Sequence, residues 1–148
     1  MKVQKFGIAD FETYQSWYKD KLVRQYLGAT PDEAWLGHIL QETDGIQYAF
    51  YDEQVLVGVM GIVFPDAQHP HYYITDIVVN PTLRGKGIGC KMLYFLTKLH
   101  PLKAEESYKA FVDVENDKAQ LFLKKLGWQL LSEHPDKEDM LTFTFKDN

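Results

Sequence analysis

The chain has 148 residues, of which 45% are hydrophobic and 25% charged, as is typical of one globular domain. Its formal charge of −5 argues against nucleic acid as the main partner. No apolar run is long enough to span a bilayer, the first residues do not have the pattern of a secretory signal, and the only cysteine, Cys90, can form no intramolecular disulfide. We therefore expect a single domain over residues 1–148, located in the cytoplasm, without a membrane partner and without a metal, as a monomer or homodimer.

The predicted elements rest on hydrophobic spacing and on capping residues. Apolar residues recur at helical spacing after Asp10, a typical N-cap, and Gly28 ends this first helix. Thr30–Glu33 resembles a capping box with proline at the first helical position, which predicts a second helix. In chain order, we predict a strand over residues 2–6, helices over 10–28 and 31–44, strands over 46–51, 55–64 and 72–79, a helix over 88–99, a strand over 108–114, a helix over 117–126, and strands over 128–131 and 140–145.

This order of elements predicts an α/β fold. We expect a mixed, mostly antiparallel central sheet of six to seven strands, with about four helices distributed over both faces. The last two helices each follow a strand directly. In such β-α-β-α segments, ligand sites lie at the ends of the strands.

The run Arg84–Gly89 contains three glycines and two basic residues directly before a predicted helix. Glycine allows the backbone to approach a ligand closely, and the free N–H groups at a helix start attract phosphate. No acidic residue occurs between Asp76 and Glu105, which makes this segment basic within an acidic chain. The Walker A and dinucleotide-binding patterns both fail at Cys90, which we expect to pack the helix onto the sheet. The run predicts a phosphate site, with a plain connecting loop as the alternative.

Two motifs resemble those of a known family. The run Arg84–Gly89 is similar to the Q/R-x-x-G-x-G/A segment of the GNAT superfamily of acyl-CoA-dependent N-acetyltransferases. The spacing Asn116-x-x-Ala119, followed by Leu-Gly-Trp at 126–128, resembles the fourth-helix pattern of the same family. The element order also agrees over nearly the whole chain.

The resemblance implies a function and a cofactor site. The chain would transfer an acetyl group from acetyl-CoA, its co-substrate, to a primary amine of a small molecule or peptide, by direct attack in a ternary complex. Backbone amides of the glycine run would hold the pyrophosphate, and the strand edge at Ile77 and Val79 would pair with pantetheine. The implied coenzyme-binding residues are Ile77, Val79, Arg84, Gly85, Lys86, Gly87, Ile88, Gly89 and Asn116.

Two residues of the strand over 72–79 are candidates for acid–base catalysis. Asp76 is an acidic residue in an otherwise apolar strand, where burial would raise the pKa of its carboxyl towards that of a useful base. It could equally bind the substrate ammonium or serve only the strand. Tyr73 is a candidate acid or relay, or a packing residue. The tyrosine that acts as general acid in many family members is replaced here by Leu123, so the family's usual general acid cannot be assigned, and water or another hydroxyl could serve instead.

Acceptor recognition is expected from the first two helices and from the loop after the hairpin. Tyr26 and Trp35 are the candidate acceptor residues, and both also fit a role in the core. His69 and His71 are further possible walls of the acceptor pocket, or they face solvent, and they lack the third ligand that a metal would need. Leu123 leaves open a second function, a non-catalytic acyl-CoA-binding sensor, and the anion site alone would also fit a nucleotide-binding protein.

Overall fold

The computed structural model describes residues 1–146, and their strands form one seven-stranded mixed sheet. The elements are β1 (Lys2–Lys5), α1 (Ile8–Trp17), α2 (Lys21–Leu27), α3 (Glu33–Gln41), β2 (Gly45–Asp52), β3 (Val55–Val63), β4 (His71–Val79), a 3₁₀ turn (Pro81–Leu83), α4 (Ile88–Leu99), β5 (Ser107–Asp113), α5 (Asp117–Lys125), β6 (Gln129–Leu130) and β7 (Met140–Phe145).

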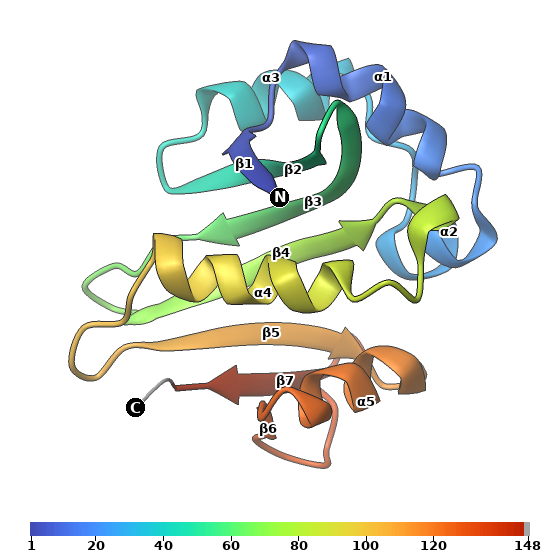
Figure 1. Ribbon diagram of the computed structural model, residues 1–148. Coiled ribbons are helices and arrows are strands. Elements are labelled where there is room, and N and C mark those ends of the chain that lie inside the picture. The colour runs from blue at the N-terminus through green and yellow to red at the C-terminus, as the bar shows by residue number, and fades with distance from the viewer. Residues whose placement is uncertain (147–148) are drawn as a thin grey trace.

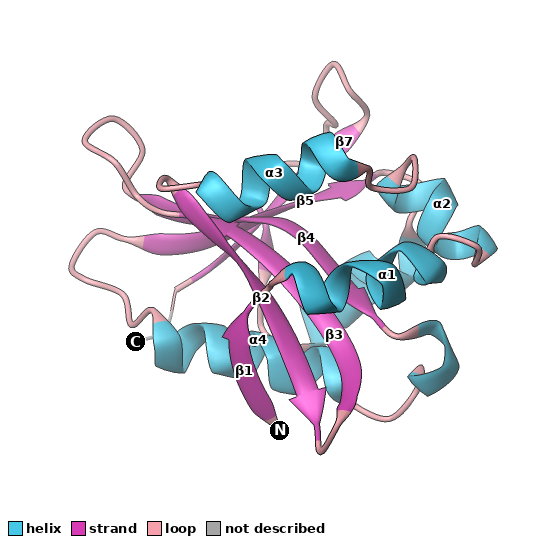
Figure 2. Ribbon diagram, turned by 90° about the horizontal axis from the view of Figure 1, so that it is seen from above, coloured by secondary structure: helices cyan, strands magenta, loops and turns pink. Residues whose placement is uncertain are grey.

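The strand order is β1-β2-β3-β4-β5-β7-β6, and β4 with β5 is the parallel pair among antiparallel neighbours. Strand residues alternate between two hydrophobic cores, as the period of two requires. One core contains Met92 and Leu96 of α4, and the other contains Tyr14 of α1 and Ile39 of α3. Helices therefore cover both faces of the sheet (Figure 1, Figure 2). The predicted fold class is confirmed, with five α-helices over residues 1–146 instead of about four.

The first predicted helix is wrong in one respect, because it is two helices. The chain turns after Trp17, and the Asp20 carboxylate then caps α2 by accepting the N–H groups of Leu22 and Val23 at 3.1 and 3.2 Å. Apolar spacing continues across this break, so periodicity alone does not reveal it. Asp10 is also not the N-cap of α1. It lies in the first turn, where its carboxylate accepts the N–H of Gly7, the residue at the cap.

Two further details differ from expectation. Asp32, and not a residue before Pro31, caps α3 by accepting the N–H of Trp35 at 2.9 Å. Cys90 is exposed on α4 and does not pack that helix onto the sheet. Within residues 1–146, no helix is long and apolar enough to cross a membrane.

Strand β4 contains the irregularity that shapes the centre of the molecule. Asp76 pairs with Gly61 of β3, and the ladder then skips Thr75, which is the extra residue of a β-bulge. On its other side, β4 pairs with β5 only as far as Ile74, which lies opposite Ala110. Beyond this point β4 and β5 diverge, and α4 begins beside the open end (Figure 1).

Candidate functional site

The loop before α4 presents free backbone amides. Gly85 and Gly87 have φ angles of +79° and +78°, and Gly87 is the N-cap of α4. No hydrogen bond within residues 1–146 uses the N–H groups of residues 85–90. A Cβ added at Gly85 or Gly87 would meet no atom within 4 Å, so the space in front of this loop is open. Together with the positive end of the helix dipole, these free amides make the surface chemically suited to an anion.

The two basic side chains of this loop differ in their surroundings. The Arg84 guanidinium makes a two-pronged contact with the Asp20 carboxylate, at 3.1 and 2.6 Å. The hydrogen bond from Arg84 lowers the pKa of Asp20, so the pair is ionised at neutral pH. Lys86 is exposed and has no ion-pair partner among residues 1–146. Lys86 therefore offers an unneutralised charge to an anion, whereas Arg84 fastens the loop to the start of α2.

The edge of β4 offers further backbone groups. The N–H of Asn80 donates to the Val57 carbonyl of β3 at 2.9 Å. In a strand, the N–H and C=O groups of one residue point to one side, and those of the next residue point to the other side. The backbone groups of Val79 and Ile77 therefore point away from β3. They face the gap in which β4 is no longer paired with β5. An extended ligand can therefore add to this edge as a short strand would.

Asn116 lies on the other side of the gap, directly after β5. Its side-chain oxygen accepts the N–H of Ala119 at 3.2 Å and caps α5. The starts of α4 and α5 lie at the same end of the molecule, beside the diverging strands (Figure 1). The amide nitrogen of Asn116 has no acceptor among the residues that the structure describes, so it remains available to a ligand.

The Asp76 carboxyl lies at the bulge in a cluster of hydrogen-bond donors. Gln47 Nε2 and the Tyr14 hydroxyl donate to Oδ2 at 2.7 and 3.4 Å, and the Thr75 hydroxyl donates to Oδ1 at 2.9 Å. Burial raises the pKa of Asp76, and these hydrogen bonds lower it by a smaller amount. The Tyr14 hydroxyl also pairs with that of Tyr18 at 2.8 Å. A carboxylate with a raised pKa is suited to accept a proton from an amine.

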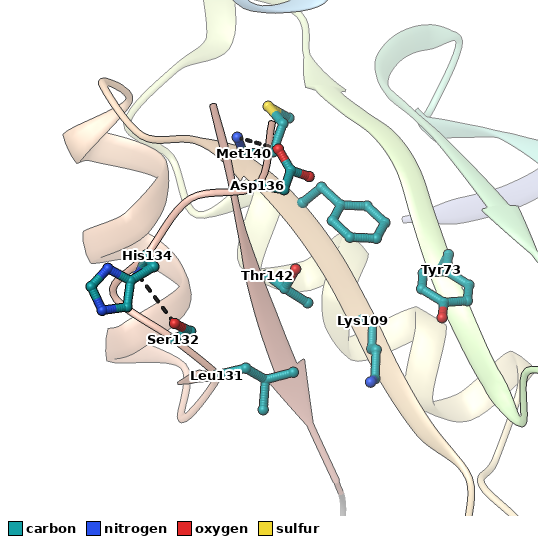
Figure 3. A pocket seen from close by; sticks show the side chains of 9 residues that line it. Tyr73, Lys109, Leu131, Ser132, His134, Asp136, Met140 and Thr142 are labelled. Carbon is teal, nitrogen blue, oxygen red and sulfur yellow. Dashed lines mark hydrogen bonds between the residues drawn. The ribbon is translucent and has the colours of Figure 1, made fainter. Parts of the chain in front are cut away.

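Two cavities lie on the sides of β4. The first, which we call the α3 cavity, has a volume of about 250 Å³ between α3, the ends of β2 and β3, and the bulge, and both Trp35 and Asp76 line it. The second, the β7 cavity, has a volume of about 350 Å³ beneath the loop between β6 and β7, and Tyr73 and Lys109 line it. Figure 3 shows these two side chains extending in the same direction from neighbouring strands.

The structure brings together some of the predicted residues and separates others. Asp76 and Trp35 share the α3 cavity. Tyr73 lines the β7 cavity, where its ring stacks on Phe111 with centroids 5.6 Å apart, so it does not meet Asp76 in one pocket. Tyr26 on α2 lines neither of these two cavities.

His69, in the loop before β4, and His71, the first residue of β4, also lie outside these cavities. His69 pairs with Asp66, and His71 with the Ser107 hydroxyl. Within residues 1–146, no group of three or more potential ligands could hold a metal ion. Leu123 is 6% exposed and belongs to the core beneath α5.

Sequence reasoning missed the partners of Asp76. Gln47 is 7% exposed in a strand of apolar and aromatic neighbours, and such a polar residue is a signal that could have been used. Gly61 inside a strand is a second signal, since glycine there marks a close approach. Tyr14 carries no such signal, because its position fits the apolar face of α1 equally well.

Comparison with known proteins decides the family. The sequence model of the acetyltransferase (GNAT) family matches residues 11–128. The chain belongs to the GNAT acetyltransferase family. The predicted resemblance to this family is thereby confirmed, and the family supports acetyl-CoA-dependent acetylation in general. A comparison with curated proteins gives no significant match.

Solved structures of GNAT proteins have the same fold over nearly the whole chain. An acetyltransferase from Thermus thermophilus matches with a TM-score of 0.81 at 13% identity, over 97% of this chain and 95% of that one. Spermidine N-acetyltransferase from Vibrio cholerae, solved with CoA and spermine, matches with a TM-score of 0.76 at 15% identity, over 97% and 94%. NAA60 from Arabidopsis thaliana, solved with a bisubstrate analogue, matches with a TM-score of 0.76 at 13% identity, over 99% of both chains. At such identities the match shows the fold alone.

Proposed function

We propose that this protein transfers the acetyl group of acetyl-CoA to a primary amine, by direct attack in a ternary complex. The observation that carries the proposal is the arrangement around the open end of β4. Unpaired amides of residues 85–90 adjoin a free strand edge, and that edge leads to the carboxyl of Asp76 at the bulge. An anion site, a channel for an extended arm and a base are the parts that this reaction needs.

The residues present fit coenzyme A. The amides of Gly85–Gly89 and the Lys86 ammonium would hold the diphosphate, because free N–H groups at a helix start favour phosphate oxygens. The carbonyl of Ile77 and the N–H and carbonyl of Val79 would pair with the pantetheine arm, and the free amide nitrogen of Asn116 would donate to it from the other side of the gap.

In the reaction, acetyl-CoA supplies an activated acyl group as a thioester. Asp76 would accept the proton of the attacking amine, since its raised pKa brings it nearer to that of its partner. The N–H of Ile77 faces the gap beside the bulge and is available to a developing oxyanion. Leu123 supplies no proton, and a thiol with a pKa of about 8.5 departs tolerably as thiolate near neutral pH.

The second candidate function is a non-catalytic acyl-CoA-binding module, and Leu123 at the position of the usual acid is the observation that favours it. Two measurements separate the candidates. Release of free thiol from acetyl-CoA over a panel of amines, including polyamines, aromatic amines, amino acids and peptides, supports the transferase. Coenzyme binding by calorimetry with no thiol release from any amine supports the module instead.

A further inference from the structure

The α3 and β7 cavities differ in charge, and an amine distinguishes between them. We propose that the α3 cavity is the acceptor site, and that it selects a small primary amine with an apolar body and no carboxylate. The inference rests on the proposed function, because it takes the amine to be the acetyl acceptor. It goes further by choosing one cavity and one class of amine.

A primary amine with a lysine-like pKa of about 10.4 enters as a cation at neutral pH. The α3 cavity is lined by two carboxylates, Asp76 and Glu42, and its single basic group, His38, is already paired with Glu42 at 3.1 Å. In the β7 cavity, Lys109 has no ion-pair partner among residues 1–146. Among the residues described, Asp136 is the one carboxylate in that lining, and its Oδ1 accepts the N–H groups of Glu138 and Met140, so one negative group faces one unpaired ammonium there. Charge therefore directs the cation to the α3 cavity and away from the β7 cavity.

The carboxyl of Asp76 has one oxygen available for an ammonium. Its Oδ2 accepts hydrogen bonds from Gln47 and Tyr14, whereas within residues 1–146 its Oδ1 accepts only the Thr75 hydroxyl. Gly61 makes room for this oxygen, because a Cβ there would collide with it. An ammonium on Oδ1 lies at the bulge on β4, the strand along whose opposite, unpaired edge we place the pantetheine arm. The acceptor nitrogen and the acyl group would thus approach the same segment of β4.

The remaining lining defines the rest of the acceptor. Trp35, Ile39 and Val63 provide apolar wall, and an aromatic face next to an ammonium adds a cation–π contact. The volume of about 250 Å³ is below the range of about 300–1,000 Å³ that holds drug-sized ligands, so the acceptor is small. A carboxylate next to the amine, as in an α-amino acid, would approach Asp76 and Glu42. Like charges in one pocket reject such a molecule.

A matched pair of acceptors tests the proposal, since 2-phenylethylamine and phenylalanine differ only by a carboxylate. We expect kcat/KM from thiol release to be at least about tenfold higher for 2-phenylethylamine. Calorimetry with CoA in place of acetyl-CoA measures binding without turnover, and 2-phenylethylamine should bind more tightly than phenylalanine. Equal or better use of phenylalanine overturns the proposal.

Variants locate the site. Val63, which is 37% exposed, can be enlarged without burying new bulk in the core, and Val63→Phe should weaken 2-phenylethylamine binding by about tenfold or more while leaving CoA affinity unchanged. Glu42→Gln should reduce the ratio of kcat/KM for 2-phenylethylamine to kcat/KM for phenylalanine. Two controls are Glu33→Gln, on α3 outside the cavity, and Lys109→Gln, in the β7 cavity. They should change neither the binding of 2-phenylethylamine nor its preference over phenylalanine. A larger effect from Lys109→Gln than from Val63→Phe overturns the assignment.

The calorimetric measurement separates this inference from the proposed function. Binding of 2-phenylethylamine that Val63→Phe abolishes, without acetylation of any amine, refutes the transferase and retains the amine site. Acetylation of other amines with no effect of Val63→Phe retains the transferase and refutes the site.

Discussion

Asp76 derives its chemistry from its surroundings, because burial raises the pKa of a carboxyl whose ordinary value is 3.8. A base acts only when deprotonated. As pH rises, kcat/KM should therefore increase, with a midpoint at a pH above 3.8. Asp76→Asn should lower kcat/KM by about 10²–10⁴-fold and remove this acidic limb. The measurement is a pH–rate profile, with the exposed Asp66→Asn as control. An unchanged profile in Asp76→Asn removes this residue from the mechanism.

Gly61 opposes Asp76 across the β3–β4 pair, and its missing side chain leaves room for three others. A Cβ at this position would meet side-chain oxygens of Gln47, Thr75 and Asp76. Gly61→Ala should therefore displace the carboxyl and lower kcat/KM at least about tenfold, since catalytic geometry tolerates little displacement. Gly37→Ala on α3 meets no atom within 4 Å and should leave kcat/KM unchanged. Wild-type kcat/KM in Gly61→Ala would contradict the proposed placement of the base.

At this scale the sequence predicts single residues better than their partners. Asp76 stands out because it is an acid among apolar strand neighbours. Its donors Gln47 and Tyr14 come from β2 and α1, and no spacing rule relates them to β4. The contact between Arg84 and Asp20 is equally hidden, since it joins residues 64 positions apart. Long-range pairs of polar side chains follow from the packing of elements, which one sequence does not specify.

The glycine run and α4 act as a single element in the proposed coenzyme site. Gly87→Val adds bulk to open space in front of the amides, so it should abolish coenzyme binding while the protein still folds. Its φ of +78° predicts a stability cost of about 1–2 kcal/mol for a residue with a side chain. Gly28→Val, at φ +88° and ψ −146° and equally without neighbours within 4 Å, is the control for backbone strain, and it is the more strained of the two variants because this region is almost restricted to glycine. Calorimetry should show coenzyme binding in the control alone, and binding in Gly87→Val would refute the placement.

Helix and strand boundaries can be predicted where local signals agree. The strand predicted over residues 140–145 is β7, Met140–Phe145, because alternation and β-branched or aromatic residues coincide there. The break between α1 and α2 escapes prediction, because the cap at Asp20 interrupts a helical pattern that continues beyond it. The bulge at Thr75 escapes it too. A one-residue change of register shows only once two strands are paired.

For the whole molecule, the order of elements along the chain is sufficient to predict the mixed sheet and the helices on both of its faces. It does not predict where β4 and β5 separate. Their pairing stops at Ile74, directly before the bulge, and the strand residues that follow face the gap. The site is thus a consequence of two local defects in an otherwise continuous sheet, and these arise from tertiary packing.

We propose that residues 1–148 unfold as one domain, and coenzyme binding tests this at the scale of the whole chain. A ligand that binds only the folded state stabilises it by about 2.7 kcal/mol at 100 times its Kd. For a chain of this size, that corresponds to a rise in Tm of about 5–10 °C. Scanning calorimetry of the wild type should show one unfolding transition, and acetyl-CoA should raise its Tm. In Gly87→Val, acetyl-CoA should leave the Tm unchanged. Two transitions, only one of which moves, would contradict the single domain. A wild-type Tm that acetyl-CoA does not change would refute the coenzyme site, because a bound ligand must stabilise the fold that binds it.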